Sequence, residues 1–324
     1  MGLALLAGAV TLRMMINVGT DVFAAGMIPN WERFGTLTAA AVTGVSLPEE
    51  DTAEKQVWVL HVVPEENPAP PPPTPLTFTA AEAETIEITG KSTYTVDKAA
   101  LLTSPLEFEN TDTPSVLIVH THTSEAYTQT TGWTYTETDP LRTTENAHSV
   151  VRVGAKVKEI LESRGISVLH DTAYNDYPDY NSSYANTRKR TEKHLKDNPT
   201  IQVVLDLHRD AVVDAAGNPV HETVTLSNGE KSARLMLVVG TDEGGLNHPN
   251  WQKNLSLGLK LQAAAARKTP DLFKSVDLRT ERFNQHLSPG ALLVEVGSAG
   301  NTLPEALTAA EELANHLADV LLGV

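Results

Sequence analysis

Histidine and carboxylate side chains occur together at two places in the sequence, and a third segment carries a glutamate alone. Residues 120–125 read HTHTSE, residues 206–210 read DLHRD, and Glu295 lies within the segment LVEVG at 293–297. The chain contains no cysteine, so no thiolate is available to bind a metal ion. A catalytic zinc ion takes three protein ligands, which His, Asp and Glu can supply, and leaves a fourth position open for water. The three segments therefore predict a catalytic zinc site, provided that the fold brings them together.

Each of these segments adjoins a short apolar run that is typical of a buried strand. The runs are residues 116–119, 202–207 and 291–296, and the titratable side chains stand at or near their carboxyl ends. In open α/β sheets, ligands bind beyond the carboxyl ends of the strands. We therefore expect the three groups of side chains to meet at one edge of a sheet.

The rest of the chain from about residue 85 alternates between strand and helix patterns. Val150, Val153, Val157 and Leu161 recur at helical spacing, and Gly165 follows as a C-cap. The other predicted elements are strands near residues 166–169 and at 235–239, and helices over about 184–196, 251–267 and 304–322. This alternation predicts a catalytic α/β domain over residues 85–324, with a largely parallel, twisted sheet covered by helices.

The N-terminal segment is apolar but short. Residues 2–10 are all small or apolar, and Arg13 and Asp21 interrupt any longer window. About 20 apolar residues are needed to cross a hydrocarbon core of about 30 Å. The segment is a signal anchor that starts upstream of Met1, a cleavable signal peptide, or a soluble amphipathic helix. We favour a membrane-directing segment over residues 1–28.

Residues 29–84 show no clear period and include a proline-rich linker. Residues 67–75 read NPAPPPPTP, which adopts an extended polyproline II rod of about 3.1 Å per residue. The run is a spacer or a ligand for a proline-binding partner. We favour a spacer, which would set the working distance of the catalytic domain from a membrane.

Composition excludes several classes of function. Asp and Glu outnumber Lys and Arg by 41 to 25, for a net charge of −16, so the surface would repel the phosphates of a nucleic acid. Aromatic residues make up only 5% of the chain, which argues against a sugar-stacking lectin. Residues 297–300 (GSAG) do not form the Gly-x-Ser-x-Gly turn of a serine hydrolase.

The motifs together resemble one known family. This chain resembles the stage II sporulation protein P family in HTHTSEAY at 120–127 and in residues 206–210 and 293–297. Members of that family are membrane-anchored peptidoglycan hydrolases of endospore-forming bacteria. The match covers about residues 88–322. It also includes the segments YPDY at 177–180 and LMLVVG at 235–240. The family looks like a relative of the zinc-dependent N-acetylmuramoyl-L-alanine amidases, so the resemblance implies a zinc amidase-like fold.

The resemblance also implies roles for individual residues, because those amidases use a His-Glu-His metal site and a second, catalytic glutamate near the C-terminus. Carried over to this sequence, His208 is a zinc ligand and Glu295 is the catalytic carboxylate. His122 is the expected first ligand, with His120 as the alternative, because Thr121 stands where the amidases have glycine.

The acidic ligand is expected to be Glu125, with Glu145, just before a helix, as the alternative. Arg209 is expected to bind a substrate carboxylate in a bidentate manner, or else to pair with Asp206 or Asp210. His120 is expected to contact the substrate if His120 is not a zinc ligand.

The implied activity is zinc-dependent hydrolysis of the amide between N-acetylmuramic acid and L-alanine in peptidoglycan, with peptide crosslinks as further substrates, during engulfment in sporulation. The implied partners are the lytic transglycosylase stage II sporulation protein D and a membrane scaffold. The implied location is the extracytoplasmic face of a forespore or septal membrane. A zinc carboxypeptidase or deacetylase acting on the cell wall and a non-catalytic wall-binding scaffold remain the alternatives.

Overall fold

The computed structural model describes residues 75–324. The predicted membrane-directing segment at 1–28 and residues 29–74, which include the proline-rich run except for its last residue, lie outside the described residues. The described fold begins ahead of the boundary expected at residue 85, because helix α3 (Ala80–Thr85) is capped by Thr79 and Glu82 and buries Ala83. Within the described part of the chain, no helix combines the length and apolar character that a membrane crossing requires.

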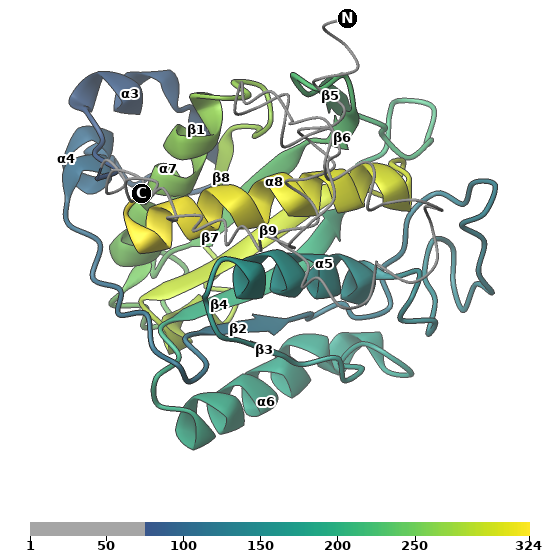
Figure 1. Cartoon of the computed structure of the whole chain (residues 1–324). Coiled ribbons are helices and arrows are strands. Elements are labelled where there is room, and N and C mark those ends of the chain that lie inside the picture. Colours follow the sequence, from purple (N-terminus) through teal and green to yellow (C-terminus); the bar gives the residue numbers. More distant parts are fainter. Residues whose placement is uncertain (1–74) are drawn as a thin grey trace, which may run out of the picture. The chain divides into compact units, whose positions relative to one another are not determined.

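A seven-stranded sheet forms the centre of the domain (Figure 1). Its strands, in spatial order, are β1 (Ile88–Gly90), β8 (Val276–Arg279), β7 (Leu235–Gly240), β9 (Gly290–Ser298), β4 (Val203–Asp210), β2 (Val116–Val119) and β3 (Val168–His170). Within this sheet only the pairing of β7 with β9 is antiparallel. The predicted α/β class with a largely parallel sheet is confirmed, and the sheet consists of two parallel groups that run in opposite directions.

Helices cover both faces of this sheet (Figure 1). The main helices are α5 (Val150–Ser163), α6 (Ser183–Asp197), α7 (Trp251–Ala266) and α8 (Leu303–Leu322). Residues of α5, α7 and α8 share one core cluster with Val116 and Ile118 of β2. The alternate residues of β2, Leu117 and Val119, belong to a second cluster against which Leu195 of α6 packs. Successive side chains of β2 therefore face opposite helix layers, as the two-residue period of a strand requires.

Smaller elements complete the described chain. They are the short helix α4 (Lys98–Thr103), the two-stranded sheet of β5 (Thr223–Thr225) and β6 (Lys231–Ala233), and the 3-10 turns η1 (Tyr180–Ser182) and η2 (Gln285–Leu287).

The sequence of α5 explains both its position and its ends. Its predicted core residues Val150, Val153, Val157 and Leu161 are fully buried, and burial of such a side chain contributes about 1.5–3 kcal/mol. The helix begins where the hydroxyl of its N-cap, Ser149, accepts from the Val151 amide. It ends before Gly165, whose φ of 80° suits a residue without a Cβ.

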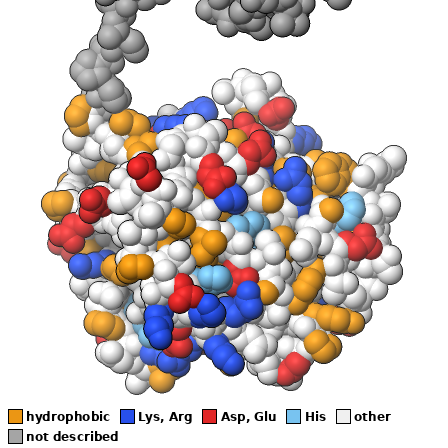
Figure 2. Space-filling view, turned by 60° about the horizontal axis from the view of Figure 1, so that its bottom comes forward, with side chains coloured by type: hydrophobic (Ala, Val, Ile, Leu, Met, Phe, Trp, Pro, Cys, Tyr) orange, Lys and Arg blue, Asp and Glu red, His pale blue; other side chains and the backbone are white. Residues whose placement is uncertain are grey.

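The helix α6 gives the acidic domain one basic region. Its Lys and Arg residues are Arg188, Lys189, Arg190, Lys193 and Lys196, against the acidic Glu192 and Asp197. Figure 2 turns the lower part of Figure 1, where α6 lies, toward the viewer and shows Lys and Arg side chains gathered in the lower centre of that face.

Candidate metal centre

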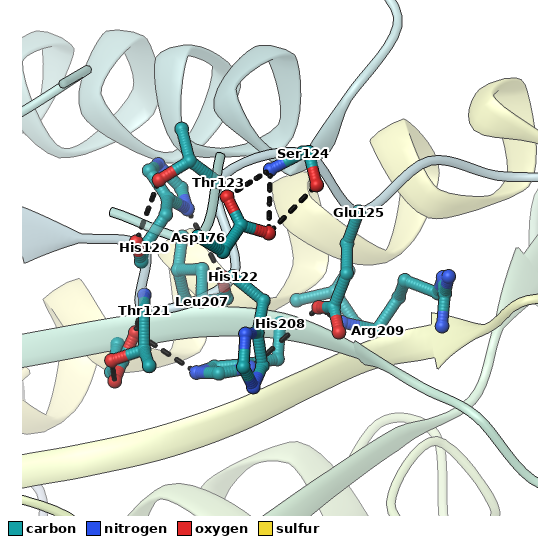
Figure 3. Close-up of polar contacts among 12 residues, drawn as sticks. His120, Thr121, His122, Thr123, Ser124, Glu125, Asp176, Leu207, His208 and Arg209 are labelled. Atoms are coloured by element: carbon teal, nitrogen blue, oxygen red, sulfur yellow. Dashed lines mark hydrogen bonds and ion pairs between the residues drawn. The ribbon is translucent and has the colours of Figure 1, made fainter. Parts of the chain in front are cut away.

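Three of the side chains singled out in the sequence meet at the carboxyl end of β2 and β4. His122, Glu125 and His208 each offer one ligand atom, and these atoms all lie within 4.8 Å of one another (Figure 3). All three residues are buried. His122 and Glu125 come from the turn after β2, and His208 lies within β4. The parallel pairing of the two strands brings the turn and the strand end together.

The turn after β2 is fixed to β4 by Asp206. Thr121 donates to the two carboxylate oxygens of Asp206, from its backbone nitrogen at 2.8 Å and from Oγ1 at 2.6 Å. The backbone nitrogen of Glu125 then donates to the carbonyl of His122 at 3.1 Å. These bonds hold the two candidate ligands of the turn at a fixed spacing.

Carboxylates surround His208. Its Nδ1 lies 3.6 Å from Oε2 of Glu125, and its Nε2 lies 3.0 Å from Oδ1 of Asp206. The second contact is an ion pair by distance, although it falls outside hydrogen-bond geometry. Burial lowers the pKa of His208, but Asp206, Glu125 and Glu295 outweigh it and raise the pKa to about 10. The same negative surroundings that favour a proton here would favour a metal cation, with Asp206 behind the ligand as is common for metal-binding histidines.

His122 provides the second imidazole. Its Nδ1 is buried and has no hydrogen-bond partner among the residues that the structure describes. Burial lowers the pKa of His122, which keeps the ring neutral, the form that binds a metal. An enclosed nitrogen without a partner, next to a carboxylate and a second imidazole, fits the ligand set of a zinc ion.

Glu295 lies beside the cluster. It is the register partner of His208 on the adjacent parallel strand β9, so the two side chains share one face of the sheet. The residue is half-buried, and its enclosed Oε2 has no hydrogen-bond partner within the described chain. Burial raises the pKa of Glu295 to about 8, with the carboxylates of Glu125 and Asp210 adding to the rise against the opposing effect of His208.

The position of His120 disagrees with both roles expected for it. It is fully buried, with Nδ1 3.0 Å from the Leu207 carbonyl and Nε2 2.8 Å from Nε2 of His170. Because a carbonyl only accepts, Nδ1 donates and Nε2 accepts from His170. The physical reason is strand alternation, which sends residue 120 to the face covered by α5, where it contacts Gly154. Neither nitrogen is free for zinc or substrate.

Glu145 also lies apart from the cluster. It is exposed, and its Oε1 accepts from the Thr136 amide at 2.8 Å. Of the two glutamates expected as alternatives, the structure thus brings Glu125 to the histidines.

Arg209 does not form the ion pair with Asp206 or Asp210 that was the alternative expected for it. It is buried, and its side chain donates to the carbonyls of Ala126 at 2.8 Å and Leu141 at 3.0 Å. Among the described residues it pairs with neither Asp206 nor Asp210. The Arg209 side chain therefore links β4 to the segments that carry Ala126 and Leu141. Its backbone nitrogen donates to Oε2 of Glu125 at 3.1 Å.

Arg142 and Tyr180 also contact this cluster, and the sequence assigns neither of them a role. Arg142 lies 3.4 Å from Oε1 of Glu125, and the ring of Tyr180 stacks on His122 with centroids 4.6 Å apart. Tyr180 belongs to the YPDY segment at 177–180, whose one signal in the sequence is the resemblance to the family. Arg142 lies in a loop whose sequence carries no periodic pattern, so no signal pointed to it.

Comparison with known proteins identifies the family. The family model described as stage II sporulation protein P matches residues 62–318. A curated relative, the stage II sporulation protein P of Bacillus subtilis (strain 168), is 29% identical over 224 residues, which cover 64% of this chain and 50% of the relative. The chain thus spans about half the length of that relative.

Several solved amidase structures are similar to this chain. The amidase AmiC2 of Nostoc punctiforme has 11% identity and a TM-score of 0.36, and covers 66% of this chain and 97% of its own. Ami1 from Mycobacterium smegmatis has 11% identity and a TM-score of 0.39, and the match covers 66% of this chain and 98% of Ami1. The CwlD amidase from Clostridioides difficile, solved in complex with the GerS lipoprotein, has 13% identity and a TM-score of 0.35. The match covers 64% of this chain and 96% of CwlD.

Proposed function

Since the chain belongs to the stage II sporulation protein P family, we propose that it is a zinc-dependent peptidoglycan hydrolase that cleaves the amide between N-acetylmuramic acid and L-alanine. The observation that carries the proposal is the buried group of His122, Glu125 and His208, with ligand atoms within 4.8 Å of one another. Two imidazoles and one carboxylate form the ligand set of a catalytic zinc, which leaves a position for water. Glu295 lies next to this group, across from His208.

The proposed reaction combines a metal with one carboxylate. When bound, zinc supplies Lewis acidity and lowers the pKa of its water from about 15.7 toward 7. Glu295 accepts the proton of the attacking water and returns it to the leaving amine. Its position suits this task, because it is in register with His208 on the neighbouring strand and its enclosed Oε2 has no hydrogen-bond partner among the described residues.

The neighbouring side chains hold these groups in place. Asp206 contacts His208 and is itself fixed by Thr121, and the Arg209 amide donates to Glu125. Such partners keep ligands oriented, and their loss commonly weakens metal binding about 10–100-fold.

Family membership also supports a setting for this activity. We propose that the protein works on the extracytoplasmic face of a membrane during engulfment, together with a lytic transglycosylase and a membrane scaffold. Cleavage of peptide crosslinks belongs to the same proposal.

Product analysis of digested cell wall tests the proposed activity. An amidase releases stem peptides that begin with a free L-alanine amino group and creates no new reducing ends in the glycan. We expect this product, and we expect a zinc chelator to abolish it and added zinc to restore it. Undiminished cleavage in the presence of chelator would contradict a metal mechanism, and release of D-alanine or acetate alone would indicate a carboxypeptidase or a deacetylase.

A further inference from the structure

Arg142 connects three segments that lie far apart in the sequence. Its Nη1 lies 2.8 Å from Oδ2 of Asp176 and 3.1 Å from Oγ of Ser124, and its Nη2 lies 3.4 Å from Oε1 of Glu125. Its guanidinium carbon also lies 4.8 Å from the ring centroid of Tyr180. The side chain is only 17% exposed, so these contacts are largely shielded from water.

The backbone around Arg142 is fixed to the turn that carries Glu125. The amide of Ala126 donates to the Leu141 carbonyl at 3.0 Å, and the amide of Thr143 donates to the Ser124 carbonyl at 2.8 Å. The guanidinium therefore approaches Glu125 from a segment that is paired with the turn on both sides of Arg142.

Tyr180 extends this contact to His122. The phenol and imidazole rings stack with centroids 4.6 Å apart and planes 4° apart. The Tyr180 hydroxyl also lies 3.3 Å from Nε2 of His122, which leaves the enclosed Nδ1 of His122 as the nitrogen without a partner. The guanidinium of Arg142 thus contacts the ring that orients a candidate ligand.

Asp176 gives Arg142 a second anchor. Its side chain is fully buried and accepts from the amide of Ser124 at 3.1 Å and from its hydroxyl at 2.7 Å. A buried carboxylate requires a compensating charge, and among the described ion pairs Arg142 alone supplies one to Asp176. The pair fixes the guanidinium between Asp176 and Glu125.

We propose that Arg142 is a positioning residue of the metal centre, which holds Glu125 by direct contact and His122 through Tyr180. Two of the three candidate zinc ligands then depend on one guanidinium. The planar guanidinium contacts two carboxylates through different nitrogens while it lies over the Tyr180 ring, and the compact ammonium of lysine does not reproduce this geometry. This inference rests on the zinc site of the proposed function.

Zinc affinity of the purified full chain, measured by competition with a chelator of known affinity, tests the inference. We expect Arg142→Met to weaken zinc binding about tenfold or more and Arg142→Lys to restore it only in part. Arg190→Met is the matched control, because Arg190 forms a bidentate pair with Asp171 away from the candidate ligands. The zinc affinity of this variant should match that of the wild type.

Tyr180 variants decide the question if Arg142→Met does not fold. Tyr180 is half exposed, so its truncation should leave the metal-free fold intact. We expect Tyr180→Ala to weaken zinc binding severalfold, Tyr180→Phe to retain most of the affinity, and the double variant Tyr180→Ala with Arg142→Lys to lose less than the sum of the single losses.

The outcomes separate this inference from the function on which it rests. If the wild type binds one zinc and both Arg142→Met and Tyr180→Ala bind it equally well, the role of Arg142 is overturned and the hydrolase proposal stands. If the wild type binds no zinc, both are overturned.

Discussion

Glu295 combines two properties that a proton carrier needs in a hydrolytic site. It faces the candidate metal ligands, because it is in register with His208 on the neighbouring strand. Its enclosed Oε2 has no hydrogen-bond partner among the described residues, so this oxygen is available to accept a proton. Neither property would matter alone, because a glutamate with an unpartnered oxygen elsewhere in the sheet could not reach the reacting water.

Replacement of Glu295 by glutamine should separate proton transfer from metal binding. We expect Glu295→Gln to lower kcat by about 10²–10⁴-fold and to leave bound zinc at one per chain, since Glu295 is not one of the three clustered ligands. Steady-state kinetics and metal analysis of the same sample check both expectations. Glu145→Gln is the matched control, because that exposed glutamate lies outside the cluster, and near-full activity of Glu295→Gln would show that another group carries the proton.

The side chains at strand ends could be found from the sequence, because an apolar run followed by His or Glu is a local pattern. The choice between His120 and His122 could not be made from the sequence, since it depends on where the chain leaves the strand. His120 continues the alternation of β2 and is directed toward α5, whereas His122 lies in the turn beyond the strand. Tyr180 and Arg142 were not predictable either, because their contacts join loops that only the folded chain brings together.

Close contacts at the junction of β2, β3 and α5 explain a glycine inside a helix. A Cβ on Gly154 would lie 2.7 Å from Nε2 of both His120 and His170. Alanine is the better helix former by about 1 kcal/mol, but overpacking a core costs about 1–3 kcal/mol. The histidine pair therefore requires the smallest residue at this position.

Gly154→Ala should destabilise the protein in spite of its higher helix propensity. We expect a net loss of up to about 2 kcal/mol in the free energy of unfolding, because overpacking costs about 1–3 kcal/mol and the helix propensity of alanine returns about 1 kcal/mol. Urea titration measures this loss. Ser163→Ala, at an exposed position of the same helix, should change this free energy by less than about 0.5 kcal/mol. A Gly154→Ala protein more stable than the wild type would show that the two histidine rings move away from the added methyl group without a loss in the free energy of unfolding.

The same histidine pair should make stability depend on pH. Burial lowers the pKa of His120 to about 4 and that of His170 to about 3, against about 6.5 in the unfolded chain. Between these values the unfolded chain binds protons that the folded chain does not, so stability falls as the pH falls below about 6.5. Each histidine contributes about 2 kcal/mol of this loss between about pH 6.5 and pH 5.

Replacement of one histidine should reduce that loss. We expect His170→Gln to lose less free energy of unfolding than the wild type when metal-free protein is compared by urea titration at about pH 7 and about pH 5. His221, an exposed histidine, supplies the control variant His221→Gln, which should keep the wild-type dependence. Equal losses in His170→Gln and the wild type would mean that the pair does not remain neutral in the folded state.

Most element positions followed from periodicity. The helices predicted at 184–196 and 304–322 are observed at Ser183–Asp197 and Leu303–Leu322. For the second helix, the apolar spacing and the capping box of Thr302 and Glu305 are local signals. The strand predicted at 202–207 continues to Asp210, so His208 lies within β4. The opposite direction of β7 relative to β9 could not be predicted, since an apolar run does not encode the direction of its strand.

At the scale of the whole molecule, a metal that binds only the folded chain must stabilise all of it. The candidate ligands come from strand β4 and from the turn after β2, and the unfolded chain would not hold them together. Zinc at about 100 times its Kd should therefore raise the free energy of unfolding by about 2.7 kcal/mol.

Thermal or urea unfolding with and without zinc checks this expectation. His208→Gln should abolish the stabilisation, because it removes the candidate ligand contributed by β4. His286→Gln should retain it, since His286 lies in η2 and outside the cluster. Equal stabilisation of His208→Gln and the wild type would place the zinc elsewhere.

The most direct test of the zinc site is an anomalous difference map from crystals of the zinc-loaded protein, recorded at the zinc absorption edge. The account predicts one strong peak bound by His122, Glu125 and His208, with Glu295 beside it and not coordinated. A peak held by His120 or Glu145, or a fully loaded crystal with no peak at this position, would contradict it.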